Sequence, residues 1–278
     1  MSRQRRGNWF IQDGDLLVPA PPDTHDPERA RAVFTEALTS LKKAAAEVLV
    51  DQRITLGAVS APQYFNDSSK AAVMDALQDV EPRMRQKWQV ITSLQAMRLA
   101  YGLNSCEGFG LGARICDIDD GTHYILVVEY EESFLQLYIL DVGADTVGVL
   151  GCSRLDNLGE AFAQRSGEEA HYRRIHDVLR NFIVDNNLGP YQKDEDFLQA
   201  VVISGEALEI ALQHLRRTIK ETLEGQGKDS KMRDSIDPIW VPAFGAAYQA
   251  MLWDKKPELL NDIVDTNFIP VDKGHDEL

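Results

Sequence analysis

Three groups of residues have types and spacings that could suit a cofactor or a metal ion. Gly108, Gly110 and Gly112 have part of the spacing of a dinucleotide-binding loop, but they follow a helical pattern and precede a strand pattern. This order is the reverse of the one that such a loop requires, so the glycines predict an ordinary connection. His171 and His176 are five residues apart and would face different sides of a helix, which does not suit a shared metal ion.

An acidic cluster, Asp117, Asp119 and Asp120, could bind a cation weakly. No calcium-loop pattern follows the cluster, so a solvated turn is the better interpretation. The chain also lacks a G-x-S-x-G string, the motif that places a nucleophilic serine on a sharp strand-to-helix turn. We therefore expect no metal site and no nucleophilic serine of this kind.

The three cysteines, Cys106, Cys116 and Cys152, are too few and too widely spaced for a disulfide framework. No two of them form a C-x-x-C pair, which argues against a zinc site. Free cysteine behaves as a small apolar residue, so we expect three buried, unreactive thiols.

Composition limits the class of protein and its partners. The chain has 278 residues, 44% of them hydrophobic, which is enough for the core of one large domain or of two small lobes. It carries 29 Lys and Arg against 44 Asp and Glu, a formal net charge of −15. Because this charge repels phosphate groups, we expect neither nucleic acid nor an anionic membrane as the main partner.

Signals for a cellular compartment are few. No apolar run approaches the ~20 residues that a membrane-spanning helix needs. Residues 1–14 are basic at their start but lack the apolar segment of a secretory signal. Residues 275–278 spell HDEL, an address for retention in the endoplasmic reticulum that works only after the chain has entered the lumen. Without an entry signal we expect a cytoplasmic protein.

The first hundred residues alternate between strand and helix patterns. Two short apolar runs within 8–19 flank Asp13-Gly14, as in a β-hairpin. Asp26 and Pro27 form an N-cap with proline at the first helical position. Helices are predicted at 27–50, 67–79 and 94–101, and short strands at 54–60 and 88–92. This alternation is typical of an α/β layer architecture.

The second half of the chain has a similar order of elements. Residues 104–121 are predicted to form a connection, and three apolar runs then predict an antiparallel meander at 122–129, 134–141 and 145–152. Later elements are a helical pattern at 156–186, a strand at 200–203, and helices at 206–224 and 241–253. The similarity of the two halves suggests a duplication of the fold, although no sequence repeats.

Four short strings match a single family in composition and order. They are SAPQYFND at 60–67, LAYGL at 99–103, VVISG at 201–205 and FGAAYQA at 244–250. Each string alone could reflect ordinary packing. Together, across residues 26–253, they make the chain resemble the nucleotide-binding domain of the seventy-kilodalton heat-shock chaperones, of the actin/hexokinase-like superfamily.

The resemblance implies an α/β fold of two duplicated ribonuclease-H-like lobes, as in actin-like ATPases. The first lobe, 1–103, would be truncated, and 104–121 would connect it to the second lobe at 122–256. The second lobe would combine the three-strand meander with parallel strands and helices, and its final helix, 241–253, would return toward the first lobe. An acidic tail, 257–278, would follow. Small residues from Gly245 would let another backbone come close to this final helix.

In this family ATP lies between the lobes, and two glycine-rich hairpins bind its phosphates through backbone N–H groups. The first hairpin, with its catalytic lysine, has no counterpart in this sequence. In the second, VEYEESF at 128–134 aligns with D-L-G-G-G-T-F, so every glycine is replaced and Glu131 and Glu132 occupy the phosphate position. Like charges at ~4 Å repel by about 1–4 kcal/mol, so we expect no ATP cofactor; an exposed acidic turn also explains the two glutamates.

Other positions that contact nucleotide in the family are also changed. Ser93 replaces a glutamate near the catalytic water, and 204–208 retains Gly205 of the adenosine turn G-G-S-x-R but lacks its arginine. Ile239 and Trp240 replace two acids before the last helix, and Trp240 is expected in the core or between the lobes. No catalytic residue or metal ligand is predicted. A degenerate nucleotide cleft would be lined by Ser93, Ser133, Ser204 and Gly205.

These patterns predict a non-catalytic pseudo-ATPase that binds another protein. One alternative is a nucleotide or small-molecule binding protein, or an ATPase, that uses the cleft between the lobes. Another is a subunit of a homo- or hetero-oligomer in which a partner covers the first lobe. The sequence does not identify the partner, but a protein partner or self-association is expected.

Overall fold

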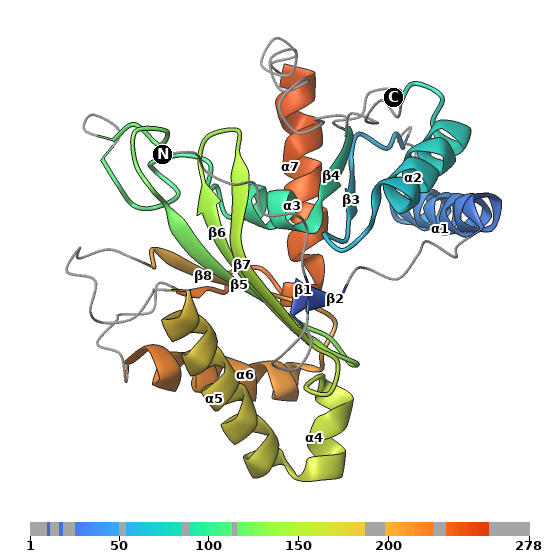
Figure 1. Ribbon diagram of the computed structural model, residues 1–278. Coiled ribbons are helices and arrows are strands. Elements are labelled where there is room, and N and C mark those ends of the chain that lie inside the picture. The colour runs from blue at the N-terminus through green and yellow to red at the C-terminus, as the bar shows by residue number, and fades with distance from the viewer. Residues whose placement is uncertain are drawn as a thin grey trace, which may run out of the picture. The chain divides into compact units, whose positions relative to one another are not determined.

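The computed structural model describes residues 10–11, 17–18, 26–49, 54–84, 89–112, 116–186, 198–224 and 232–255 (Figure 1). They form two compact units, one drawn from 1–24 and 93–245 and the other from 25–92 and 246–278. The α/β fold class is confirmed, whereas the lobe boundaries predicted from the sequence stay a prediction. Of the helices in the described ranges, none is long and apolar enough to cross a bilayer.

The first unit is built on a five-stranded mixed sheet with the order β7-β6-β5-β8-β9. Its strands are β5 (Tyr124–Tyr130), β6 (Leu135–Val142), β7 (Val147–Leu155), β8 (Ala200–Ser204) and β9 (Met232–Arg233). The first three pair antiparallel as the meander that the apolar runs predict. β8 then pairs parallel to β5, and β9 parallel to β8.

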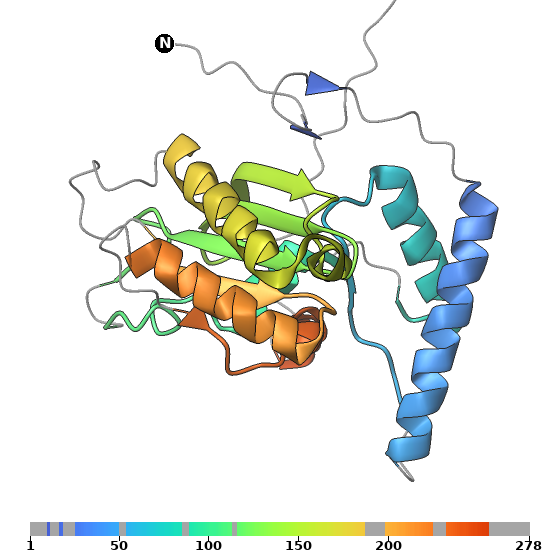
Figure 2. The ribbon, with the colours of Figure 1, turned by 90° about the horizontal axis from the view of Figure 1, so that it is seen from below.

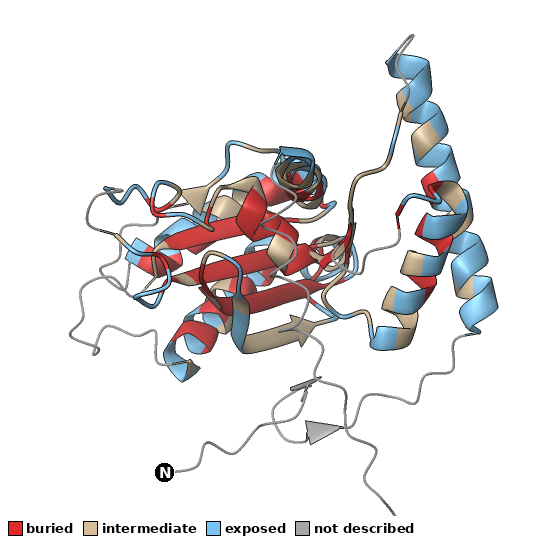
Figure 3. Ribbon diagram, turned by 90° about the horizontal axis from the view of Figure 1, so that it is seen from above, coloured by how far each residue is buried: buried red, intermediate tan, exposed pale blue. Residues whose placement is uncertain are grey.

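The central strand β5 is covered on both faces. Leu126, Val128 and Tyr130 belong to a core with α5 (Glu168–Asp185) and α6 (Glu209–Glu224), which lie side by side on one face (Figure 2). Ile125 and Val127 belong to a second core with α3 (Ser93–Ala100). Burial on both faces explains the unbroken apolar run of β5. Figure 3 colours the inner strands of the sheet as buried.

The helical pattern at 156–186 forms two helices rather than one. α4 (Glu160–Ser166) ends at Gly167, and α5 begins at the following residue. Gly167 has a φ of 81°, a left-handed conformation that favours glycine and interrupts the helix.

The second unit contains α1 (Pro27–Val48), α2 (Asp67–Val80) and a parallel pair of strands, β3 (Val59–Ala61) and β4 (Val90–Thr92). Asp26 and Asn66 cap the two helices by accepting backbone N–H bonds, at 3.0 and 2.8 Å. Leu38 of α1 packs on Leu77 of α2 and its neighbours. The strand predicted at 54–60 is shorter than expected, because only 59–61 pairs with a neighbour.

At the N-terminus, β1 (Phe10–Ile11) and β2 (Leu17–Val18) pair antiparallel, as the hairpin signal predicts. Asp13-Gly14, which would form the turn, lies outside the described residues. Residues 225–231 and the predicted acidic tail 257–278 also lie outside them. The final helix, α7 (Val241–Lys255), contributes residues to both units.

The expectation of three free thiols is wrong for two of the cysteines. Cys106 and Cys116 form a disulfide across ten residues of the connection, with their Cα atoms 5.9 Å apart. Cys106 lies within a run of consecutive turns at 101–110, and the spacing of the two cysteines alone did not indicate the bond. Cys152 is free and half-buried, and burial raises the pKa of its thiol.

α3 and the start of α7 lie in backbone contact at Gly245, as the small residues predict. A Cβ atom on Gly245 would overlap the carbonyl group of Ala96 and lie 2.6 Å from its Cα. Because the obstacle is backbone, a side chain there cannot be accommodated by a change of rotamer.

Gly245→Ala should therefore lower the free energy of unfolding by about 1–3 kcal/mol. Gly112→Ala is the matched control, since no atom lies within 4 Å of its added Cβ, and it should change stability by less than about 0.5 kcal/mol. Urea unfolding of the two variants and the wild type measures both effects. Equal stability of the two variants would contradict the close helix contact.

Candidate functional site

The carboxyl ends of β5 and β8 bring two of the predicted site residues together around a carboxyl group. Glu129 of β5 lies opposite Ser204, the last residue of β8. Ser93, the first residue of α3, donates its hydroxyl to Glu129 Oε1 at 3.1 Å. Ser93, Glu129 and Ser204 have exposed fractions of 6%, 7% and 2%, so the group is almost closed to solvent.

Gly205 lies directly beside this group, and its contribution is through the backbone. Its φ is 129°, and a Cβ atom there would overlap the carbonyl group of Tyr130. Its N–H donates to the carbonyl oxygen of Pro238 at 3.3 Å. Glycine is therefore needed for the turn after β8 to lie against the end of β5.

Ser133 is not part of the buried group. It lies in the exposed turn between β5 and β6, which is closed by a bond from the Glu131 N–H to the Phe134 carbonyl at 3.0 Å. Gly159 supports this turn from behind, because a Cβ there would overlap the backbone of Ser133 and Phe134. The structure thus groups three of the four predicted residues and leaves the fourth on the surface.

The electrostatics of this site are acidic. Burial raises the pKa of Glu129 to about 7, although the Ser93 hydrogen bond opposes the shift, and the nearby Glu131 charge adds to it. Burial also raises the pKa of Glu131, against the bond that its carboxylate accepts from the Glu206 N–H at 3.1 Å. The positive charge of Arg154 opposes the rise of the pKa at both Glu129 and Glu131.

Arg154 is committed to other partners. Its guanidinium lies over the ring of Phe134 at 3.7 Å, and its Nε donates to Asp156 at 2.7 Å. It therefore offsets part of the acidic charge while its Nε and one face of its guanidinium are engaged within the chain. Arg154 lies on a different strand, β7, and matches no motif, so it was not predictable as part of this group.

The Glu129–Ser93 pair has the pKa of a general acid or base near neutral pH, but not the access. Both side chains are more than nine-tenths buried, so a substrate cannot reach the proton that they share. The arrangement therefore suits a structural hydrogen bond. A single acid inside the apolar run VVEY was the sequence signal for a buried carboxyl group.

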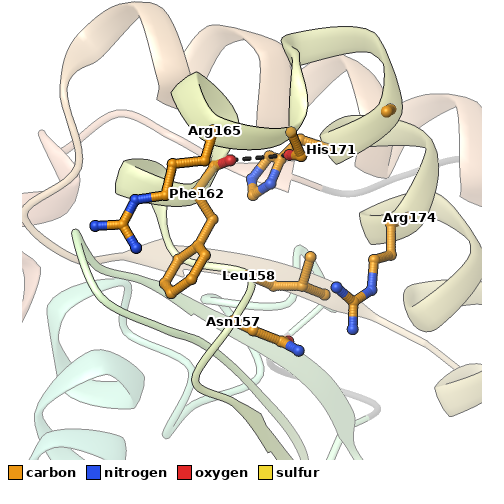
Figure 4. Close-up of a pocket in the computed structure, with 8 residues that line it drawn as sticks. Asn157, Leu158, Phe162, Arg165, His171 and Arg174 are labelled. Carbon is orange, nitrogen blue, oxygen red and sulfur yellow. Dashed lines mark hydrogen bonds between the residues drawn. The ribbon is translucent and has the colours of Figure 1, made fainter.

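A pocket of about 310 Å³ lies beside α4 and α5, away from these residues (Figure 4). Its lining residues are Asn157, Leu158, Phe162, Arg165, Ser166, Ala170, His171 and Arg174. His171 is buried and its Nε2 lies 3.1 Å from the Tyr130 hydroxyl, while burial lowers the pKa of the ring. His176 instead lies 3.4 Å from Asp177. Within the described ranges no three potential metal ligands gather.

Comparison with known proteins identifies the family. A family profile described as Hsp70 protein matches residues 18–165, more than half of the chain. The chain belongs to the Hsp70 family. The chaperone protein DnaK of Burkholderia cepacia is 26% identical over 266 residues, which cover 94% of this chain and 34% of DnaK. The chain therefore spans about a third of the length of this Hsp70 relative.

Membership of the Hsp70 family agrees with the mixed α/β architecture, which fits an actin-like ATPase fold. The profile covers β5, β6, β7 and the turn that carries Glu131, Glu132 and Ser133. The acidic turn is thus a feature of an Hsp70-type sheet. The match supports an ATPase-like domain that includes this turn.

Glu129→Gln should change the pH dependence of stability. The folded-state pKa of Glu129 lies above its ordinary value of 4.5, so the folded protein binds this proton more tightly than the unfolded chain. Stability contributed by the protonated group is therefore lost as the pH rises from about 4.5 to about 7. The variant should be more stable than the wild type by about 1–3 kcal/mol at pH 8 and similar at pH 5.

Denaturant unfolding at the two pH values measures this difference. Glu132→Gln, in the exposed turn of the same sheet, is the control and should follow the wild type. Parallel behaviour of Glu129→Gln and the wild type at both pH values would contradict the raised pKa.

Proposed function

We propose that this chain is a non-catalytic module of the Hsp70 fold that binds another protein and does not use ATP. The acidic end of β5, where three carboxyl groups lie within four residues, is the observation that supports it most directly. Those residues are Glu129, Glu131 and Glu132. Fold and activity separate readily in this way, because catalysis depends on a few residues carried by the scaffold.

Phosphate binding at this end of the sheet would need free backbone N–H groups in a concave turn. Two of the N–H groups here are already used: that of Glu131 donates to Phe134 O, and that of Glu206 donates to the Glu131 carboxylate. The carboxylate thus occupies a donor that an anion would need. Each carboxylate at ~4 Å would also repel a phosphate by about 1–4 kcal/mol.

Protein binding is supported by an exposed apolar surface at the start of α7. Ile239, Trp240 and Phe244 are 50%, 56% and 56% exposed. Trp240 and Phe244 are one helical turn apart, so they share a face. Trp240 was expected in the core or between the lobes; the core location is wrong, because more than half of the surface of Trp240 is accessible. Large exposed aromatic residues are the side chains that most often dominate binding at protein interfaces.

The substitution pattern points the same way. Ile239 and Trp240 stand where the resemblance places two acids, and both side chains are exposed. A surface position that changes from acid to large apolar residue loses solubility unless another protein covers it. The relative DnaK is named a chaperone protein, which makes a protein the natural ligand class for this surface.

The cytoplasmic location predicted from the sequence stays a prediction. The Cys106–Cys116 disulfide argues against it, because such bonds persist in oxidising compartments and are rare in the cytosol. The proposed role as a binding module does not depend on the compartment.

Isothermal titration of the full chain with Mg-ATP should give no binding stronger than about 1 mM. The double variant Glu131→Gly/Glu132→Gly is the matched comparison, because it removes the two carboxyl groups nearest to the expected phosphate position. A gain of affinity in that variant would assign the exclusion of ATP to these carboxylates. Micromolar binding by the wild type would overturn the proposal.

Trp240→Ala/Phe244→Ala should remove partner proteins that the wild-type chain retains in an affinity capture read by mass spectrometry, with and without ATP. Each lost aromatic anchor is expected to cost about 2 kcal/mol or more of binding free energy. Leu150→Ala, 54% exposed on β7, is the control and should retain the same proteins. Unchanged capture by the double variant would exclude this surface as the binding site.

A further inference from the structure

Helix α1 carries two apolar stripes, and its neighbour α2 covers only one of them. Leu38 is buried against α2, with Phe34 packed beside it. Two ion pairs border that contact, Arg31 with Asp79 and Lys42 with Glu81. The residues facing α2 therefore already have partners.

The second stripe is exposed along the whole helix. Its members are Val33, Ala37, Leu41, Ala44 and Val48. The three large residues, Val33, Leu41 and Val48, are 57%, 59% and 79% exposed. Figure 3 shows α1 as mostly exposed along its length. At 3.6 residues per turn these five positions fall within an arc of about 80°, so they form a continuous apolar seam.

The spacing of this stripe is that of a helix–helix interface. The intervals between its members are four, four, three and four residues. Alternation of threes and fours keeps a seam facing a partner helix, as in coiled coils. A helix face that contacts only water does not require this spacing of apolar residues. The two alanines, Ala37 and Ala44, would allow the partner helix to approach closely between the larger side chains.

The order of residues in the stripe is nearly palindromic. Two antiparallel copies of α1, centred between Ser40 and Leu41, would place Val33 against Val48 of the partner subunit. Ala37 would then meet Ala44 of the partner subunit, and the two Leu41 side chains would lie together at the centre. A parallel pair or an unrelated helix would gain nothing from this symmetry.

Charge on one flank of the stripe fits the same arrangement. Glu36 and Lys43 are exposed on one edge of the seam, and neither has an ion-pair partner among the described residues. In an antiparallel pair, the same edge of each helix faces its equivalent on the other helix. Glu36 would therefore lie within about two residues of Lys43 of the partner subunit, and Lys43 would lie equally close to Glu36 of the partner subunit. The two pairs are related by the two-fold axis, as a symmetric dimer requires.

We propose that the exposed stripe of α1 pairs antiparallel with the same stripe of a second copy of this chain. Five small or medium side chains from one helix make a limited interface, at the low end of the range for specific complexes, below about 1,200 Å². The dimer is therefore weak and depends on protein concentration. It rests on the α1 stripe alone and is independent of ATP binding.

Sedimentation equilibrium of the full chain should show reversible dimerisation as its concentration rises. Leu41→Glu should weaken the dimer by at least about tenfold, because it places two carboxylates together at the centre of the seam. Thr39→Glu introduces the same side chain on the opposite side of α1 and should dimerise like the wild type. A strictly monomeric wild type, or a dimer that survives Leu41→Glu, overturns the proposal.

Cysteine cross-linking tests the direction of pairing. Leu41→Cys should form a disulfide-linked dimer, and a mixture of Val33→Cys with Val48→Cys should form a mixed one. Val33→Cys alone should not cross-link, because its two copies would lie roughly 22 Å apart along the helices. The wild type under the same oxidant controls for Cys152. Efficient cross-linking of Val33→Cys alone would indicate a parallel or unrelated contact and would overturn the antiparallel arrangement.

The same measurements separate this inference from the proposed function. Trp240→Ala/Phe244→Ala leaves α1 unchanged and should dimerise as the wild type does. Leu41→Glu should in turn retain the proteins captured through the α7 surface. Circular dichroism and thermal unfolding of Leu41→Glu should match the wild type, since the side chain is 59% exposed. Failure of one proposal therefore leaves the other standing.

Discussion

Burial of β5 on both faces is the constraint on which the first unit depends. Every residue from Ile125 to Tyr130 is buried, with alternate side chains assigned to the cores under α3 and under α5 and α6. The strand also pairs with β6 on one side and β8 on the other. No face or edge of β5 is left to solvent, so its carboxyl end is held in place by the whole sheet. A polar side chain at this end of β5 is therefore held in a fixed position, but it loses its hydration.

Glu129 shows this cost most clearly. It belongs to a strand that otherwise contains apolar and aromatic side chains, and its carboxyl group has the pKa of a group held out of water. The Ser93 hydroxyl satisfies one oxygen, which makes the burial tolerable. An acid at this position is compatible with the fold and adds negative potential at the carboxyl end of β5 when it ionises, near pH 7. The buried carboxyl group thus agrees with the proposal that the scaffold persists without binding ATP.

Elements with strong local patterns were predictable from the sequence. α1 and α2 begin at capping residues, and the meander strands are continuous apolar runs between turn formers. The site was predictable only in part. Ser93 and Ser204 come together through the register of β5 and β8 and the start of α3, as their alignment implied. Ser133 does not join them, because sequence position along a turn does not show which way the backbone faces.

Features that depend on contacts between distant residues were not predictable. The Cys106–Cys116 disulfide joins residues ten apart in an irregular connection, whose path no local pattern indicates. Arg98 is a further case: its periodic position on α3 gives no sign that its guanidinium donates to the carbonyl groups of Gly143 and Ala144 in the turn between β6 and β7. Burial lowers the pKa of this guanidinium only to about 10, so it stays charged. A buried cation that binds main-chain carbonyls holds the meander against α3 without needing a carboxylate.

The turn between β5 and β6 is held by hydrogen bonds within the chain, which agrees with the proposal that the module does not use ATP. In a glycine-rich hairpin the free N–H groups are satisfied by the bound anion, so the empty turn leaves donors exposed. Here Glu131 N–H donates to Phe134 O, and the carbonyls of Glu131 and Glu132 accept the N–H groups of Glu160 and Ala161 at the start of α4. The Glu131 side chain accepts the Glu206 N–H as well. The chain itself thus uses the Glu131 N–H and the carbonyl groups of Glu131 and Glu132 in its own hydrogen bonds, which hold the turn in place without a bound anion.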